Sequence, residues 1–289
     1  MPIFILTSCL RENKNLAKVL EAYTKNGIRN IEIGPAHEYV KQPINLVKSY
    51  QADFTVHSYF PPPKKPMVIN LASQDKGLLQ RSLTQIKKSI RFCKSIGARL
   101  FSFHPGFRID PQEREAAPEG ELDNTLDFYY DQRIPLVPYE KAFDTFVNSV
   151  AEICDYTQGL GVRVAVENTG SVSKDKYLMM CESQEFKRLF SEVSDDNFGM
   201  LLDLGHLKLA STARNFDKYD FMNSIKEHVF ELHVHDNDGI NDEHRVPDNN
   251  SWCMEVIKDF NNVPITLEAM NLNMSDVIQA KRLIEEAIK

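Results

Sequence analysis

Residues 229–245 read VFELHVHDNDGINDEHR, and this segment changes character halfway along. Its first half alternates apolar and polar residues, as a strand does, up to His233 and His235. Side chains two residues apart on a strand point to the same face, so these two imidazoles share a side. A polar turn then leads to Asp242 and His244. The pattern indicates either a metal-binding strand end or ordinary surface histidines, and this segment alone leaves both interpretations open.

Short apolar runs like this one recur along the chain and alternate with helical patterns. We expect strands at residues 3–6, 30–33, 53–56, 100–103, 163–166, 198–202, 229–235 and 265–267, with the clearest helices at 16–23, 44–50, 78–96, 139–158 and 275–289. Short, almost continuously apolar strands suit an all-parallel sheet, because helices cover both of its faces. Eight such strand–helix units close into a barrel. The sequence therefore predicts an α/β protein, a (β/α)8 TIM barrel that forms a single domain over residues 1–289.

One long segment interrupts this alternation. Residues 108–138 hold eight acidic and three basic residues and show no clear periodicity, so we expect an irregular insertion there. Because it follows the strand end at His104, it would lie above the mouth of the barrel, where Phe128, Tyr129 and Tyr130 could cover a bound ligand. We expect it to act as a lid, with a solvated excursion or a contact between copies of the chain as the alternatives.

Composition limits the classes of function. The chain has 41 acidic and 34 basic residues and a formal net charge of −7, which disfavours nucleic acid and anionic membranes as partners. Its five cysteines are scattered and form no Cys-x-x-Cys pair, so we expect reduced thiols in a cytoplasmic protein. The opening MPIFILTS does not resemble a signal peptide, and we expect no membrane span. The sequence leaves the oligomeric state open.

Residues of metal-ligand type stand at the carboxyl ends of six successive expected strands, the end at which such barrels build their sites. These residues are His57, His104, Glu167, Asp203, His206, His233, His235, Asp242, His244 and Glu268. A single histidine or acid at a strand end is more often a solvated loop residue, but that is a poor explanation for six successive ends. Several carboxylates in one cavity also disfavour each other's ionisation unless cations are present. Imidazoles and carboxylates without thiolates suit zinc, manganese or a similar divalent ion.

Seven motifs between residues 56 and 270 resemble the xylose isomerase-like TIM barrel superfamily, which includes sugar phosphate isomerases and epimerases and the endonuclease IV-like proteins of AP endonuclease family 2. The motifs are VHSYFPPPKKPMVINLAS, FSFHPG, VAVENTG, MLLDLGH, LHVHDNDG, DEH and ITLEAM. Resemblance to endonuclease IV implies three zinc ions, held by His57, His104, Glu167, Asp203, His206, His233, Asp242, His244 and Glu268. Resemblance to the isomerases and epimerases implies one ion, held by Glu167, Asp203, His233 and Glu268. We therefore expect one to three divalent ions, zinc or manganese.

The choice between His233 and His235 rests on spacing. The family pattern His-x-x-Asp fits His233 with Asp236, which makes His233 the expected ligand, although His235 and Asp238 have the same spacing. The candidate substrate-binding residues are then His235, Arg245, Lys174 and Lys208. Each of the three cations is equally compatible with a solvated loop charge.

Other features separate the chain from endonuclease IV. The first strand and its loop read FILTSCLRENKN, where endonuclease IV-like proteins carry a Gly-Ala-His-type strand and a DNA-reading loop. The acidic insertion is a poor surface for a phosphate backbone. Residues 246–250 (VPDNN) stand in place of Gly-Glu-Gly, and residues 30–34 (NIEIG) resemble the sugar-acting branch.

The resemblance implies a divalent-metal-dependent sugar or sugar-phosphate isomerase or epimerase, which acts on a small carbohydrate by proton transfer through an enediolate. Glu167 and Glu268 would exchange the proton, and His206 is a further catalytic candidate. The alternative is an endonuclease IV-like zinc phosphodiesterase acting on abasic DNA; the number of matched ligands favours it and the surface charge disfavours it. A third hypothesis is a metal-binding barrel that senses carbohydrate without catalysis.

Overall fold

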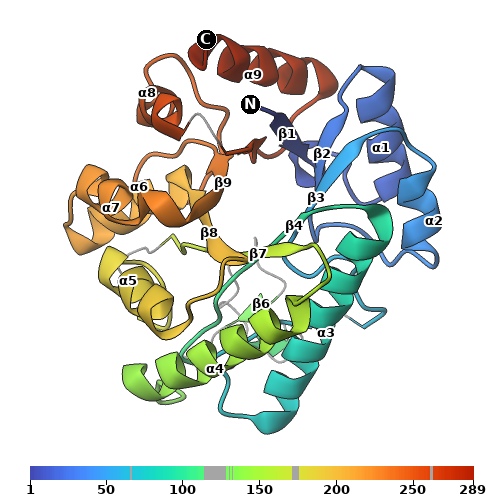
Figure 1. Ribbon diagram of the computed structural model, residues 1–289. Coiled ribbons are helices and arrows are strands. Elements are labelled where there is room, and N and C mark those ends of the chain that lie inside the picture. The colour runs from blue at the N-terminus through green and yellow to red at the C-terminus, as the bar shows by residue number, and fades with distance from the viewer. Residues whose placement is uncertain (66, 114–127, 130, 132, 171–175, 261–262) are drawn as a thin grey trace.

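The computed structural model describes residues 1–65, 67–113, 128–129, 131, 133–170, 176–260 and 263–289. Eight parallel strands close into a barrel in the order β1-β10-β9-β8-β7-β4-β3-β2, and helices surround it (Figure 1). The strands are β1 (Ile3–Leu6), β2 (Asn30–Ile33), β3 (Asp53–His57), β4 (Leu100–Phe103), β7 (Arg163–Glu167), β8 (Phe198–Asp203), β9 (Val229–Val234) and β10 (Ile265–Leu267). This confirms the (β/α)8 TIM barrel, and no strand end differs from its expected place by more than one residue.

The helices are α1 (Leu16–Lys25), α2 (Pro43–Lys48), α3 (Lys76–Ile96), α4 (Tyr139–Thr157), α5 (Ser183–Glu192), α6 (Leu204–Arg214), α7 (Lys218–Ile225), α8 (Trp252–Val256) and α9 (Met274–Ala287). Short polar residues begin several of them. The side chain of Asp75 accepts the backbone N–H of Leu78 at the start of α3, and Asp203 accepts that of His206 at the start of α6. None of the described helices is long and apolar enough to cross a bilayer.

Alternation along β9 separates an apolar face from a polar face. Leu232 and Val234 of β9 pack in the hydrophobic core, whereas Glu231 and His233 take the other face. All four side chains are buried. Leu232 and Val234 lie under the surrounding helices, whereas Glu231 and His233 are enclosed by the strands of the barrel. The polar face therefore runs up the inside of the barrel toward the carboxyl ends of the strands.

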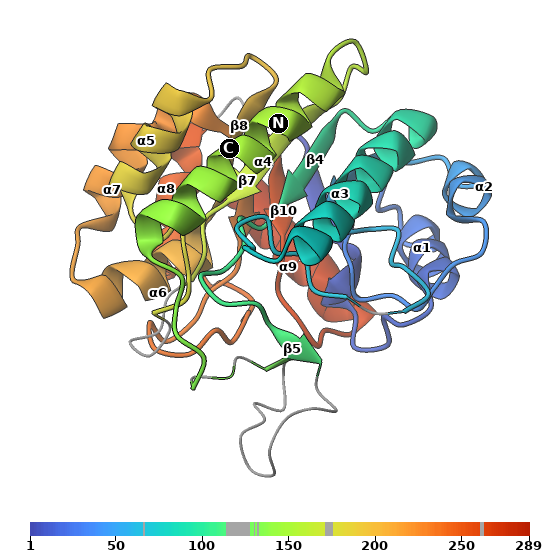
Figure 2. The ribbon, with the colours of Figure 1, turned by 90° about the horizontal axis from the view of Figure 1, so that it is seen from below.

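The insertion expected at residues 108–138 includes a short antiparallel ribbon, formed by β5 (Gln112–Glu113) and β6 (Phe128–Tyr129) (Figure 2). Two backbone hydrogen bonds hold the two ends of the insertion. The N–H of Arg108 donates to the carbonyl of Tyr177, and the N–H of Val137 donates to the carbonyl of Arg108. Residues 114–127 and 130, and the side chains of Phe128 and Tyr129, lie outside the described residues. The lid therefore stays a prediction.

The loops that follow β1 and β2 meet at His37. Its Nε2 lies 2.7 Å from the hydroxyl of Thr7, in the 3-10 turn η1 (Thr7–Cys9), and its Nδ1 contacts the carbonyl oxygen of Asn13. The same Thr7 hydroxyl accepts the backbone N–H of Gly34. Burial lowers the pKa of the His37 imidazole to about 4, so the folded protein holds this ring neutral.

We expect this histidine to make folding sensitive to acid. An unfolded chain, with a histidine pKa of about 6.5, takes up a proton that the folded chain refuses until about pH 4, so stability is lost as the pH falls between these values. For His37 alone the free energy of unfolding should fall by about 2 kcal/mol between pH 7 and pH 5. Urea unfolding of chelator-treated protein measures it, and His37→Gln should show a shallower pH dependence than the wild type. Equal slopes would contradict this prediction.

Candidate functional site

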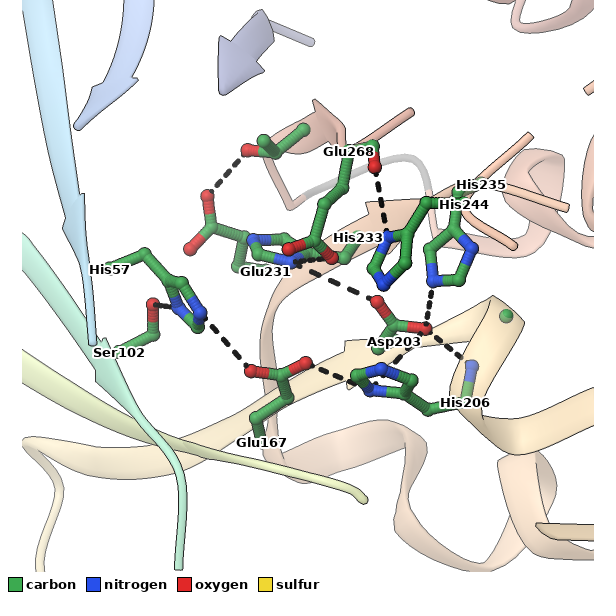
Figure 3. A network of polar contacts seen from close by, with 12 residues as sticks. His57, Ser102, Glu167, Asp203, His206, Glu231, His233, His235, His244 and Glu268 are labelled. Carbon is green, nitrogen blue, oxygen red and sulfur yellow. Dashed lines mark hydrogen bonds and ion pairs between the residues drawn. The ribbon is translucent and has the colours of Figure 1, made fainter. Parts of the chain in front are cut away.

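The carboxyl ends of five barrel strands meet in one buried polar cluster (Figure 3). His57 ends β3, Glu167 ends β7, Asp203 ends β8, His233 lies near the end of β9, and Glu268 directly follows β10. Glu167, Asp203 and His233 are fully buried, whereas Glu268 is 6% exposed. One ligand atom from each of Glu167, Asp203, His233 and Glu268 lies within 4.8 Å of the others. These four residues, called the central group below, surround a single point.

Glu167 is encircled by imidazoles. Its Oε2 lies 3.3 Å from Nδ1 of His104 and 3.5 Å from Nε2 of His57, and its Oε1 lies 3.0 Å from Nδ1 of His206. Burial alone would raise the pKa of this carboxyl group, but His104, His57 and His206 more than offset burial and hold the pKa below its ordinary value. Glu167 is therefore a carboxylate at neutral pH. The side chain of His104 is 42% exposed and opens this group to the mouth of the barrel.

His233 lies between two carboxylates. Its Nδ1 is 2.8 Å from Oε2 of Glu268, and its Nε2 is 2.7 Å from Oε2 of Glu32. Burial lowers the pKa of this imidazole, but Glu32 and Glu268 together raise the pKa well above its ordinary value. The other oxygen of Glu32 accepts the hydroxyl of Thr55, 3.3 Å away. The two carboxylates therefore fix the orientation of the ring.

A further group lies beside the central group, at the same end of the barrel. Asp242 Oδ2 is 3.3 Å from Nε2 of His206 and 3.2 Å from Nε2 of His244. His235 completes this group, and one ligand atom from each of the four residues lies within 4.8 Å of the others. Burial lowers the pKa of His244, but Asp242 and Glu268 raise it, to about 9 overall. The nine ligands implied by the family resemblance are thus all brought together, and His235 joins them.

These residues fit divalent ions. Among the described residues, both carboxylate oxygens of Glu167, Oδ2 of Asp203 and both ring nitrogens of His235 are buried without a hydrogen-bond partner. Leaving such polar atoms unsatisfied costs free energy, which a cation placed between them would recover. The donors are imidazoles and carboxylates without thiolates, a set that suits zinc or manganese.

The two expected substrate-binding cations that the structure describes, Lys208 and Arg245, contact residues outside the cluster. The ammonium group of Lys208 binds Oδ1 of Asp236 at 2.7 Å and the carbonyl of Asn237 at 2.5 Å. The side chain of Arg245 is 52% exposed and contacts Glu243 at 3.3 Å. Lys174 lies outside the described residues. Asp236 also accepts the hydroxyl of Ser251, so the His-x-x-Asp spacing delivers an aspartate that organises the loop after β9.

The structure adds residues that sequence reasoning did not include. Asn168 joins the ends of β7 and β8, since its side chain accepts the backbone N–H of Asp203 and donates to the Asp203 carbonyl. Ser102 on β4 lies 3.0 Å from Nδ1 of His57. Glu32 holds His233, as described above. A signal for Glu32 existed, because it is the one acidic residue in the apolar strand NIEI.

We expect Glu32→Gln to weaken metal binding. The carboxylate of Glu32 stabilises the ring of His233 from the side opposite the central group, and losing such a partner typically reduces metal affinity by about 10–100-fold. Competition with a coloured chelator measures the affinity. Glu231→Gln is the matched control, because Glu231 is equally buried on β9 but binds the hydroxyl of Thr266. An unchanged affinity in Glu32→Gln, or an equal loss in the control, would contradict the prediction.

A family model described as xylose isomerase-like TIM barrel matches residues 20–289. The uncharacterized protein MJ1614 of Methanocaldococcus jannaschii is 24% identical over 239 residues, which cover 81% of this chain and 77% of that protein.

Two solved structures have the same fold. A D-tagatose 3-epimerase-like protein superposes with a TM-score of 0.75 at 18% identity and covers 100% of this chain and 97% of its own. The IolI protein, solved with a binding zinc atom, superposes with a TM-score of 0.70 at 17% identity and covers 100% of this chain and 98% of its own.

Proposed function

The chain belongs to the xylose isomerase-like TIM barrel family, and from that premise we propose that it is a divalent-metal-dependent sugar or sugar-phosphate isomerase or epimerase. The observation that carries the proposal is the central group, in which two glutamates, an aspartate and a histidine converge to within 4.8 Å at the mouth of the barrel. A small carbohydrate is the proposed substrate, and the structural similarity to a D-tagatose 3-epimerase-like protein supports this choice.

Glu167 and Glu268 are the proposed acid–base pair. They approach the same point from β7 and from the end of β10, so a substrate carbon placed between them would face one carboxylate on each side. Removing a proton from a carbon next to a carbonyl leaves an enediolate, and returning a proton to the other face inverts that carbon. Glu167 is a carboxylate at neutral pH, which is the protonation state that a general base requires.

Asp203 and His233 are the proposed binding partners of the ion, together with the two glutamates. A divalent ion held there would supply a Lewis acid for neighbouring oxygens of the sugar. Asn168 and Glu32 hold Asp203 and His233 in place through the contacts given above. His206 lies with its Nδ1 3.0 Å from Oε1 of Glu167. It would orient this glutamate and would not act directly on the substrate.

The second candidate function is zinc-dependent cleavage of abasic DNA. The observation in its favour is the presence of two further groups of ligand-type residues, one containing His57 and His104 and the other containing His206 and His244. The net charge of −7 and the acidic insertion argue against a DNA partner.

Proton exchange with solvent tests the proposal. Zinc- or manganese-loaded protein is incubated in deuterium oxide with a panel of ketoses, aldoses and their phosphates, and with an abasic-site oligonucleotide in a parallel arm. We expect at least one sugar to give a new epimer or isomer with deuterium at the carbon next to the carbonyl, and chelator-treated protein to give none. Cleavage of the oligonucleotide without exchange on any sugar would favour the second candidate and contradict the first.

A further inference from the structure

Asn70 lies in the loop between β3 and α3, and its fully buried side chain holds a different loop. Its Oδ1 accepts the backbone N–H of Phe107 at 2.9 Å. Its Nδ2 donates to the carbonyl of Phe107 at 3.1 Å and to Oδ1 of Asp110 at 2.8 Å, and it lies 3.4 Å from the carbonyl oxygen of Ile109. The two N–H groups of this amide therefore face three oxygens at the start of the insertion.

The backbone before Phe107 is packed against the same amide. Gly106 has a φ of 121°, and a Cβ atom added to it would lie 2.6 Å from Oδ1 of Asn70 and 2.8 Å from the backbone nitrogen of Leu71. Only glycine allows so close an approach in that conformation. The backbone N–H of Asn70 is held in turn by Oγ of Ser82 in α3, 3.0 Å away. The path of the loop after β4 therefore depends on the position of Asn70.

The segment held by Asn70 also pairs with the loop between β7 and α5. Phe107 forms an antiparallel bridge with Leu178. In the same loop, the backbone N–H of Thr169, two residues after the end of β7, donates to the carbonyl of Met180 at 3.1 Å. The contacts that begin at this amide therefore extend through two loops to the end of β7.

The chain held by Asn70 leads back to His104. Nδ1 of His104 lies 3.3 Å from Oε2 of Glu167, and the His104 side chain is 42% exposed. In the part of the chain that the structure describes, residues 104–106 form no backbone–backbone hydrogen bond. The path of the chain just after His104 is therefore fixed by the hydrogen bonds between Asn70 and Phe107.

We propose that Asn70 is a positioning residue, which holds the chain after His104 and thereby keeps the His104 imidazole against the carboxylate of Glu167. The inference rests on the proposed function in one respect, because Glu167 is the proposed base. Asn70 acts through Phe107 and His104 and not on the substrate. A purely structural role, in which the amide stabilises the fold and nothing more, is the alternative that the experiment has to separate.

Asn70→Asp is the decisive variant. It keeps the shape of the side chain and the acceptor for the N–H of Phe107, but it places a carboxylate opposite three oxygens. We expect kcat on the sugar that the exchange screen identifies to fall by about a hundredfold, with a much smaller change in KM, because a small displacement near the reacting groups is enough for such a loss.

The pH dependence of this loss gives a signature that a structural role lacks. Asp110 is the one titratable residue among the described hydrogen-bond partners of Asn70, and burial together with its charge would raise the pKa of the introduced carboxyl group. Once protonated, that group can donate a hydrogen bond again. The ratio of variant to wild-type kcat should therefore rise as the pH is lowered from about 8 to about 6. Adding Asp110→Asn to Asn70→Asp should also recover part of kcat, because it restores a donor at this contact.

Nuclear magnetic resonance of zinc-loaded protein with ¹⁵N-labelled histidine tests the positioning without reference to turnover. The ring signals of His104 should shift in Asn70→Asp, and the amide of Phe107 should exchange faster with solvent. Ser149→Ala is the matched control, since it removes another buried hydrogen bond from the same loop, between its hydroxyl and the carbonyl of Leu71 at 2.8 Å. It should lower thermal stability but leave the His104 signals and kcat unchanged.

A folded Asn70→Asp with wild-type kcat and unmoved His104 signals would overturn the proposal. So would a loss of kcat that is the same at every pH and is matched by Ser149→Ala, which would leave Asn70 a structural role only. If Asn70→Asp does not fold, Asp110→Ala takes its place and should move the His104 signals in the same protein state, and unmoved signals would again count against the proposal. A wild type that turns over no sugar would contradict the proposed function, while the His104 signals still decide the role of Asn70.

Discussion

Replacing Glu268 with glutamine is expected to lower kcat by about a thousandfold or more while leaving the barrel folded. General acid–base groups contribute about 10²–10⁴-fold to a rate, and this substitution also removes a negative charge from the central group. Glu268 follows β10 directly, and its Oε2 lies 2.8 Å from Nδ1 of His233. Glutamine keeps the size of the side chain, so the loss should come from chemistry and metal affinity and not from packing.

The effect of Glu268→Gln is measured on whichever sugar the exchange screen identifies, at saturating metal, so that weaker metal binding does not hide the effect on turnover. Glu285→Gln is the matched control. It removes the same charge from α9, where Glu285 pairs with Lys281 one helical turn away. A Glu268→Gln variant with full metal occupancy and near-normal kcat would show that the acid–base pair has been assigned wrongly.

Two simple rules allowed the sequence to place these candidate residues at one end of the barrel. Alternation along a strand fixes which face a side chain takes, and parallel strands of a barrel end at one rim. His57, Glu167, Asp203 and Glu268 each end or directly follow a barrel strand, so locating the strands located these residues.

The same rules do not say how the residues divide into groups. His233 and His235 share a face, yet His233 joins the central group and His235 joins Asp242 and His244. That division depends on the space above Gly205 and on a loop whose path the sequence pattern does not specify. Spacing also did not show that Asp236 would bind Lys208.

Glu32 was missed for a different reason. It lies inside an apolar strand, where a single acid carries no motif of its own, and its role appears only when β2 and β9 approach across the barrel interior to place it 2.7 Å from His233. The helices α5 to α8 were not among the clearest patterns either. In α6, for example, the apolar residues are spread around the helix because its first turn is buried next to the site.

Replacing Glu167 with glutamine should abolish net epimerisation but preserve proton exchange on one face of the substrate. If Glu167 and Glu268 serve opposite faces, the epimer whose proton faces Glu268 can still lose that proton and regain one from solvent on the same side. The opposite epimer should neither exchange nor convert. Glu268→Gln should show the reverse pattern, because Glu167 is then the remaining base.

Nuclear magnetic resonance in deuterium oxide distinguishes these outcomes, with each epimer supplied separately to each metal-saturated variant. Conversion should fall by about a thousandfold or more in both variants, while exchange should persist with a different epimer in each. Loss of all exchange in both variants, at full metal occupancy, would mean that the two carboxylates act as one unit. If one variant instead keeps full conversion, a single base serves the reaction, as in an aldose–ketose isomerisation on one face, and the opposed pair proposed from the central group is wrong.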